Sequence, residues 1–284
     1  MMFAIVGLGA VGSMLAYFLN AAGIEPCAVV RSRCDEYRFC AGGSDCARLR
    51  VRVVSSLPSG VRYTLVAVKA PDTEGALKAA AGIPVIFQNG IGGLELARGR
   101  FPAAYGAVVT YGVYREGCRS ELRGLGEIVL PRGAEEVAEA LERGGARVRV
   151  VDDIEPYRWR KLVVNAALNP VTAILQAPNG VVLADPWARA LAGRLAEEAA
   201  AVARARGYPV ESPAAEVFGV AEMTARNISS MAQDIARCRQ TEVEFINGAV
   251  VKYGAALGVP TPYNHAVYLL IKSLEGRCRA LQSF

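Results

Sequence analysis

Residues 2–12 have the sequence MFAIVGLGAVG, and this stretch decides the fold of the first half of the chain. Met2–Val6 is a short apolar run, as expected of a buried strand. Gly7, Gly9 and Gly12 follow it directly with the spacing G-x-G-x-x-G. At this spacing the first glycine permits a tight turn, the second lets a pyrophosphate approach the backbone, and the third lets a helix pack closely on the strand.

The residues that follow the glycines predict a dinucleotide-binding unit. Ser13–Ala22 has a helical pattern that stops at Gly23, and Pro26–Val30 is a second apolar run. A strand, a glycine turn, a helix and a strand within about 30 residues form the context that this fingerprint requires. A glycine-rich core turn without a ligand is the alternative. A bound dinucleotide would place its phosphates on the turn and the helix start, which consist of Gly7, Leu8, Gly9, Ala10, Val11 and Gly12.

The end of the second predicted strand indicates which dinucleotide is bound. An acidic residue at this point would accept a hydrogen bond from a ribose hydroxyl and favour NAD. The chain instead has Arg31 and Arg33, and no carboxylate follows until Asp35. Because guanidinium groups suit a 2′-phosphate, the sequence favours NADPH, with NADH as the second possibility. A pair of solvated arginines is the alternative interpretation.

Two further predicted strands end in polar residues. Thr64–Val68 is followed by Lys69, and Pro84–Phe87 is followed closely by Asn89. In an open parallel sheet the ligand lies outside the carboxyl ends of the strands. We therefore expect Lys69 to meet a phosphate or a substrate anion, and Asn89 to reach the nicotinamide ribose or the substrate. Taken singly, they would be a surface lysine and a turn asparagine.

The remaining pattern predicts an α/β chain with two domains. After the strands above, the first half continues with an antiparallel extension, a helix and a last strand: Ala104–Val113, Glu121–Arg123, Glu127–Leu130, Ala134–Arg143 and Arg147–Val151. The second half predicts long helices: Pro186–Arg206, Pro213–Arg226, Ser230–Leu257 and Pro262–Arg279. We expect an N-terminal Rossmann-type dinucleotide-binding domain over residues 1–151, followed by an all-helical C-terminal domain over residues 152–284.

Composition and charge exclude several classes of protein. The net charge of +5 is spread along the chain without a basic block, which argues against a nucleic-acid partner and suits a small anionic substrate. The first 24 residues carry no charge, yet they lack the positive start of a secretory signal and are interrupted by the glycines. The sequence thus predicts a cytoplasmic protein without a membrane anchor.

Seven cysteines have spacings that match no zinc site, so no metal is expected. Their odd number argues against a secreted disulfide framework and favours reduced, semi-buried side chains. A bridge within the segment Cys34–Cys46 is the alternative, because disulfides also occur inside hyperthermophiles.

Lys161, Asn165 and Asn169 form a polar stripe in an otherwise apolar helical segment. A step of four residues keeps side chains on one face of a helix. Because burying such groups without partners costs a few kcal/mol each, the stripe is expected to face a ligand or a polar network. The chain has a single histidine, His265, so lysine and the carboxylates are the main candidates for proton transfer.

Over nearly its whole length the chain resembles the ketopantoate reductase (2-dehydropantoate 2-reductase) family. The resemblance rests on motifs in a shared order: residues 7–12, Val68-Lys69-Ala70, Gln88-Asn89-Gly90, residues 159–165, Asn169-Pro170, Asn179-Gly180, residues 229–234, Thr241-Glu242, Ile246-Asn247-Gly248 and residues 260–264. Leu8, where a small residue is more usual, and the weakly basic run before Thr241 depart from the pattern.

The resemblance implies NADPH-dependent reduction of 2-dehydropantoate to (R)-pantoate, and a homodimer formed through the helical domain. It makes Lys161 and Glu242 catalytic, with Lys161 as the general acid. Ser230 would bind the substrate carboxylate, and Glu242 a hydroxyl group or the lysine. The implied substrate site consists of Asn89, Lys161, Asn165, Asn169, Asn179, Asn227, Ser230 and Glu242.

A lysine is also chemically suited to this reaction, independently of the resemblance. Hydride addition to a ketone leaves negative charge on oxygen, which an ammonium group stabilises before it donates a proton. Two alternatives stay open at this point: a related dehydrogenase acting on another 2-oxo or 2-hydroxy acid, and a non-catalytic NADP-binding sensor.

Overall fold

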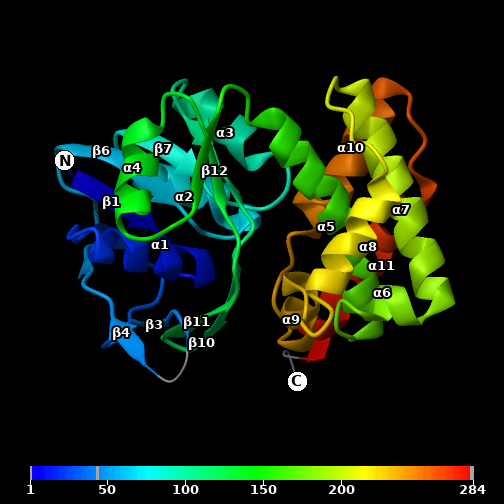
Figure 1. The fold of residues 1–284 in the computed structure, drawn as a ribbon, viewed down its shortest axis with the longest axis horizontal. Coiled ribbons are helices and arrows are strands. Elements are labelled where there is room, and N and C mark those ends of the chain that lie inside the picture. Colours follow the sequence, from blue (N-terminus) through cyan, green and yellow to red (C-terminus); the bar gives the residue numbers. More distant parts are fainter. Residues whose placement is uncertain (1, 43–44, 282–284) are drawn as a thin grey trace. The chain divides into compact units, whose positions relative to one another are not determined.

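The computed structural model describes residues 2–42 and 45–281 and divides the chain into two compact units (Figure 1). One unit contains the chain up to Gln88 together with Gly93–Ile154, and the other contains Asn89–Gly92 together with the chain from Glu155 onward. The first unit is mixed α/β and the second is helical, as the sequence predicted. The short segment Asn89–Gly92 packs with the helical unit although both of its neighbours in sequence belong to the other.

A six-stranded parallel sheet organises the first unit. Its strand order is β5-β2-β1-β6-β7-β8, with bounds Arg52–Val53, Cys27–Val29, Met2–Val6, Val61–Val66, Ile83–Ile86 and Tyr105–Gly106. Side chains alternate between the two faces of a strand, and on β1 Phe3 and Ile5 join one hydrophobic core while Val6 joins another. The first core includes helices α1 (Ala10–Ala21) and α4 (Glu135–Arg143), and the second includes α2 (Thr73–Ala79) and α3 (Gly93–Arg100). A sheet covered on both faces in this way is the Rossmann-type arrangement.

The glycine turn is required by the packing of this unit. Gly7 has φ +93°, and a Cβ atom there would lie 2.6 Å from Val68 Cγ1. A Cβ atom at Gly12 would lie 1.9 Å from the carbonyl oxygen of Gly7. A side chain at Gly12 would therefore push α1 away from the turn after β1, and one at Gly7 would collide with Val68 in the segment after β6.

The predicted antiparallel extension is partly wrong. β8 (Tyr105–Gly106) pairs in parallel with β7 and extends the main sheet. Beyond it, β9 (Val108–Val109) pairs antiparallel with β12 (Ile128–Pro131), which pairs in parallel with β13 (Val148–Val151). A separate sheet has the order β10-β11-β3-β4, with bounds Gly112–Glu116, Arg119–Gly124, Arg38–Cys40 and Cys46–Arg48. The apolar run from Ala104 does not reveal that its first residues have a parallel neighbour, because the pairing partner is distant in sequence.

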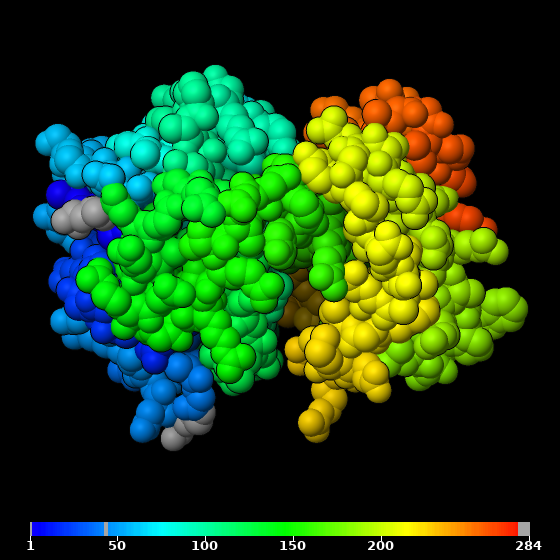
Figure 2. Space-filling model, turned by 45° about the horizontal axis from the view of Figure 1, so that its top comes forward, coloured from blue at the N-terminus to red at the C-terminus, as the bar shows by residue number. Residues whose placement is uncertain are grey.

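The second unit consists of helices around one core. Its main members are α5 (Glu155–Leu175), α7 (Pro186–Ala205), α8 (Pro213–Met223), α10 (Asn247–Leu257) and α11 (Pro262–Leu281), with the short α6 (Val181–Ala184). Residues of α8 contribute to the yellow surface in Figure 2. α5 continues across the buried Pro170.

The prediction of one helix over Ser230–Leu257 is wrong. The structure has α9 (Ser230–Ala236), a turn, the 3₁₀ helix η2 (Val243–Phe245) and then α10. Cys238 has φ +49°, a left-handed conformation that a continuous helix does not allow. The interruption places Glu242 at the start of η2 rather than on a long helix.

Cysteine pairing differs from the expectation of reduced side chains. Cys34 is bonded to Cys118, and Cys40 to Cys46. The second bridge is of the kind allowed for within Cys34–Cys46. Cys238 is also disulfide-bonded and Cys27 is a free, buried thiol, while the side chain of Cys278 lies outside the described part of the chain.

The two bridges give a matched test of stability. Replacing Cys34 and Cys118 by serine should lower the free energy of unfolding by about 2 kcal/mol more than the same change at Cys40 and Cys46. The reason is that the first bridge spans 84 residues and the second 6, and a longer closed loop restricts the unfolded chain more. Denaturant unfolding of both double variants measures the difference, and equal losses would contradict this explanation.

No helix among the described residues is long and apolar enough to cross a membrane. Within the same ranges, no cluster of three or more His, Cys, Asp or Glu side chains could hold a metal ion.

Candidate active site

The polar stripe of the sequence lies on α5. Lys161 and Asn165 are half-buried, and Asn169 is 7% exposed. Apolar residues of α5 next to the stripe are fully enclosed in the core of the second unit, among them Leu162, Val163 and Ala166. The packing of these neighbours fixes the rotation of the helix, and the rotation fixes where the polar stripe points.

Lys161, Asn89 and Glu242 form a hydrogen-bonded chain. Lys161 Nζ donates to Asn89 Oδ1 at 2.8 Å, and Asn89 Nδ2 donates to Glu242 Oε2 at 2.8 Å. An ammonium group can only donate and a carboxylate can only accept, so the orientation of the amide between them is determined. Glu242 is 8% exposed. A cation and an anion are thus held on opposite ends of one amide.

Burial lowers the pKa of Lys161 to about 8, and the negative charge of Glu242 opposes this shift. At neutral pH the lysine is therefore mostly protonated, yet it releases its proton far more easily than a lysine in water. A group with a pKa close to the working pH is well suited to proton transfer.

The turn at η2 also positions Asn89. The backbone N–H of Ile91 donates to the carbonyl oxygen of Phe245 at 2.9 Å. Gly90 has φ +81°, and a Cβ atom there would lie 2.2 Å from the same oxygen. The segment that carries Asn89 is thus seated directly on the turn that carries Glu242.

Asn179 and Asn227 are brought together by the backbone. The N–H of Asn179 donates to the carbonyl oxygen of Asn227 at 2.9 Å, and Asn179 Nδ2 donates to Thr224 Oγ1 at 2.9 Å. Asn179 Oδ1 is buried and has no hydrogen-bond partner among the described residues. An unpaired buried carbonyl of this kind is costly and is available to a ligand that donates a hydrogen bond.

Ser230 is exposed at the first turn of α9, whereas its neighbour Ser229 is buried. Ser229 Oγ caps the helix by accepting from the N–H of Ala232 at 3.1 Å, and it lies 2.7 Å from Thr172 Oγ1 on α5. Ser229 thereby connects the start of α9 to α5. The sequence Ser229-Ser230 alone does not indicate that the first serine caps the helix and that the second is exposed.

Two asparagines among the family motifs hold helices together. Asn247 Nδ2 donates to the carbonyl oxygen of Ala166 at 2.9 Å and to Asn264 Oδ1 at 3.0 Å. Asn264 Nδ2 donates in turn to the carbonyl oxygen of Leu195 at 3.1 Å. Both asparagines are fully buried. They fix α5 against α10, α11 and α7, and their role is structural.

In the first unit the glycine turn fits a dinucleotide phosphate. Gly9, the N-cap of α1, has no side-chain cap, so N–H groups at the helix start are available to an anion. A Cβ atom at Gly9 would meet nothing nearer than Ala67 O at 3.8 Å. Internal packing therefore requires glycine at positions 7 and 12 but leaves open space at Gly9, where the fingerprint places the pyrophosphate.

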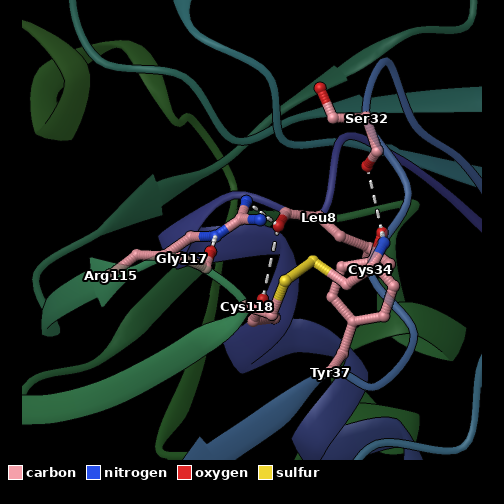
Figure 3. Close-up of a disulfide and its surroundings, with 8 residues drawn as sticks. Leu8, Ser32, Cys34, Tyr37, Arg115, Gly117 and Cys118 are labelled. Atoms are coloured by element: carbon pink, nitrogen blue, oxygen red, sulfur yellow. Dashed lines mark hydrogen bonds between the residues drawn. A yellow bond between two sulfur atoms is a disulfide. The ribbon is translucent and has the colours of Figure 1, made fainter.

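The neighbouring strand ends gather around this turn. Arg115 of β10 donates a hydrogen bond to the carbonyl oxygen of Leu8 (Figure 3). Cys118, in the turn after β10, forms a disulfide with Cys34 in the loop after β2. Arg31 in that loop is exposed and lies 3.5 Å from Asp72. An exposed ion pair of this kind contributes little stability, so it would not prevent the guanidinium group from binding a ligand.

Lys69 and Gln88 follow the adjacent strands β6 and β7. Gln88 Nε2 donates to the carbonyl oxygen of Lys69 at 3.3 Å, and Thr73 Oγ1 donates to Gln88 Oε1 at 2.9 Å. This places the backbone of Lys69 at the carboxyl edge of the sheet, beyond the end of β6.

Comparisons with known proteins agree over nearly the whole chain. The family described as "Ketopantoate reductase PanE/ApbA" matches residues 3–135, and "Ketopantoate reductase PanE/ApbA C terminal" matches residues 153–275. A 2-dehydropantoate 2-reductase of Pyrobaculum aerophilum is 54% identical over 280 residues, which cover 98% of this chain and 100% of the relative.

Solved structures have the same fold. A PanE/ApbA family ketopantoate reductase from Ralstonia eutropha JMP134 is 29% identical with a TM-score of 0.90, covering 98% of this chain and 100% of the other. A D-mandelate dehydrogenase solved with NADH and anilino(oxo)acetate is 23% identical with a TM-score of 0.91, covering 98% and 99%. The second likeness shows the fold alone. On the family matches and the identity to its curated relative, the chain belongs to the ketopantoate reductase family.

Proposed function

We propose that this chain is an NADPH-dependent 2-dehydropantoate 2-reductase, which forms (R)-pantoate on the route to pantothenate and coenzyme A. The observation that carries the proposal is the hydrogen-bonded chain Lys161–Asn89–Glu242 in a member of the ketopantoate reductase family. It combines a proton donor, a rigid amide and a carboxylate.

When bound, a nicotinamide cofactor would supply the hydride that reduces the C2 ketone of the substrate. Lys161 stabilises the negative charge that develops on the ketone oxygen, and its ammonium group then transfers a proton to that oxygen. Asn89 fixes the lysine through a 2.8 Å hydrogen bond. Water restores the proton of Lys161 after each turnover.

Polar side chains of the second unit supply substrate contacts in this proposal. Asn165 and Asn169 continue the stripe of Lys161 along α5, and Glu242 accepts a hydrogen bond from a substrate hydroxyl. Asn179 offers an unpaired buried oxygen to a second hydroxyl. Asn227 is bonded to the backbone of Asn179, while the exposed hydroxyl of Ser230 is assigned to the substrate carboxylate.

Cofactor contacts fall on the first unit and on Asn89. The backbone of Gly7, Leu8, Gly9, Ala10, Val11 and Gly12 would hold the pyrophosphate. Lys69 would lie near the cofactor phosphates, and Asn89 would contact both cofactor and substrate. These assignments divide the chain into an NADP-binding domain, residues 1–151, and a substrate-binding and dimerisation domain, residues 152–284. A cytoplasmic homodimer completes the proposal.

Arg31 is assigned to the 2′-phosphate of NADPH, since its guanidinium group is exposed, its ion pair with Asp72 is long at 3.5 Å, and no acidic residue occupies the NAD position. Arg31→Ala should raise the Kd for NADPH about 10-fold or more and leave that for NADH nearly unchanged, as expected for the loss of a charge-assisted contact. Titration of both cofactors by fluorescence measures this. Equal changes for the two cofactors would remove Arg31 from the proposal.

The substrate assignment is tested by NADPH oxidation with 2-dehydropantoate beside simpler 2-oxo acids. We expect kcat/KM to be highest for 2-dehydropantoate, because hydrogen-bonding groups that a smaller acid leaves unpaired penalise it strongly. A higher kcat/KM with a simpler acid would favour a related 2-oxo acid dehydrogenase. Cofactor binding without turnover would favour a sensor.

A further inference from the structure

The turn Thr241–Phe245 positions two members of the hydrogen-bonded chain. Glu242 lies at its start, and Phe245 at its end accepts the N–H of Ile91, which seats the segment of Asn89. The helical part of this turn is only three residues long. So short a 3₁₀ helix has little stability of its own, and its position must be set by contacts outside it.

The main contact is a buried carboxylate on α11. Glu275 is 4% exposed, and its Oε1 accepts from the N–H of Thr241 at 2.7 Å and from Thr241 Oγ1 at 2.6 Å. Thr241 Oγ1 in turn accepts from the N–H of Val243 at 3.1 Å. Two charge-assisted hydrogen bonds thus hold the residue directly before Glu242.

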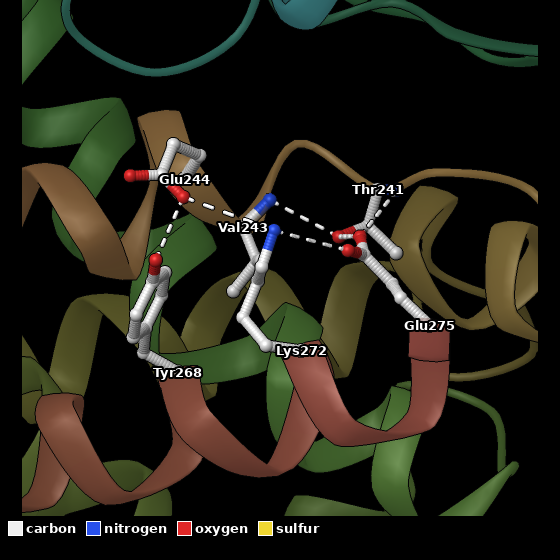
Figure 4. A network of polar contacts seen from close by, with 6 residues as sticks. All are labelled: Thr241, Val243, Glu244, Tyr268, Lys272 and Glu275. Atoms are coloured by element: carbon white, nitrogen blue, oxygen red, sulfur yellow. Dashed lines mark hydrogen bonds and ion pairs between the residues drawn. The ribbon is translucent and has the colours of Figure 1, made fainter. Parts of the chain in front are cut away.

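A second anchor holds Glu244, two residues after Glu242, and Figure 4 shows Glu244 beside Tyr268 and Lys272. Tyr268 donates to Glu244 Oε2 at 2.7 Å, and this hydrogen bond raises the pKa of Tyr268 to about 12, so the phenol stays a donor. Lys272 lies 3.9 Å from Glu244 and 3.4 Å from Glu275 Oε2. Tyr268, Lys272 and Glu275 are four and three residues apart, so their side chains share one face of α11.

The buried carboxylate of Glu275 and its ion pair with Lys272 are not expected to add much to the free energy of unfolding. Burying a carboxylate is costly, and replacing a buried ion pair by apolar residues is often neutral or stabilising. A buried carboxylate that accepts two hydrogen bonds from one residue does, however, fix that residue in a single position. Fixing Thr241 in this way also fixes the position of Glu242 next to it and, through Phe245, that of Asn89.

We propose that Glu275 is a positioning residue, which anchors the Thr241–Phe245 turn through Thr241 and so holds Glu242 and Asn89 in hydrogen-bonding register with Lys161. This inference rests on the proposed roles of Lys161 and Glu242. Glu275 itself acts through Thr241 and takes no part in proton transfer.

The test compares Thr241→Val with Thr241→Ser in the full-length enzyme. Valine removes the hydroxyl group that bonds to Glu275 and to the N–H of Val243 while keeping the shape of threonine, whereas serine keeps the hydroxyl. We expect kcat to fall about 10-fold in Thr241→Val, the scale of one lost charge-assisted hydrogen bond, and to stay within about 3-fold in Thr241→Ser. Thr241→Ala is the second variant should valine prevent folding.

Two further readouts separate positioning from general destabilisation. Because Glu242 raises the pKa of Lys161, a displaced Glu242 should move the alkaline limb of kcat to lower pH in Thr241→Val, a shift that a general loss of stability would not produce. Thr261→Val is the matched control: this buried threonine at the start of α11 packs against Gly254 of α10, so its loss should lower Tm without lowering kcat.

The outcomes distinguish the inference from the proposed function. Near-parent kcat in Thr241→Val, together with an impaired Glu242→Gln, would overturn the role of Glu275 alone. An equal loss in Thr261→Val would also overturn it. Near-parent kcat in Glu242→Gln would instead contradict the proposed function on which the inference rests.

Discussion

Lys161→Ala should lower kcat by about 10²–10⁴-fold, the usual contribution of a positioned general acid. Alanine removes both the cation that stabilises the developing oxyanion and the proton that completes the alcohol. It also leaves Asn89 Oδ1 without its 2.8 Å donor. The Kd for NADPH should change little, because the glycine turn belongs to the other unit. Steady-state NADPH oxidation with 2-dehydropantoate measures kcat directly.

Lys252→Ala is the control for this prediction. Lys252 is an exposed lysine on α10 of the same unit, so its removal changes the net charge equally without touching the proposed site. We expect its kcat to match that of the parent enzyme. A kcat of Lys161→Ala within a few-fold of the parent would exclude Lys161 as the acid.

Glu242→Gln should lower kcat by about 10–100-fold at pH 8, on the scale of a hydrogen bond to a charged group. Glutamine keeps the acceptor for Asn89 Nδ2, so the geometry is largely retained while the charge is lost. Without that charge the pKa of Lys161 falls below its value of about 8, and less of the lysine is protonated at pH 8. The loss should therefore shrink as the pH is lowered towards 6.

Glu222→Gln provides the comparison, since Glu222 is an exposed carboxylate on α8. It removes the same charge from the same unit, and its kcat should equal that of the parent at each pH. If the loss in Glu242→Gln were the same at pH 6 and pH 8, Glu242 would act through substrate binding and not through the lysine.

Local sequence was sufficient for much of the fold. A Cβ atom at Gly12 would meet Gly7 itself, only five residues earlier, so the spacing of these two glycines carries the information. The break within Ser230–Leu257 was not predictable in this way. Apolar residues continue through it, and the contact that stabilises the turn comes from Glu275, 34 residues after Thr241.

The candidate site likewise has a part that local sequence predicts and a part that it does not. A spacing of four residues predicts that Lys161, Asn165 and Asn169 share a face of α5, because the helix itself sets the geometry. The bonds of Asn89 to Lys161 and to Glu242 span 72 and 153 residues, and no local pattern encodes them. Glu275 was missed for a similar reason: on a helix surface its position resembles that of any charged residue, and only the packing buries it.

The pH dependence of kcat, compared between the parent enzyme and Lys161→Ala, tests the central claim most directly. A general acid acts in its protonated form, so the parent should be fully active below the pKa of Lys161 and lose activity as the pH rises through about 8. Lys161→Ala should be slow throughout and lack this transition. A parent profile that stays flat from pH 7 to about 10, or a transition that persists in Lys161→Ala, would contradict the assignment of Lys161 as the proton donor.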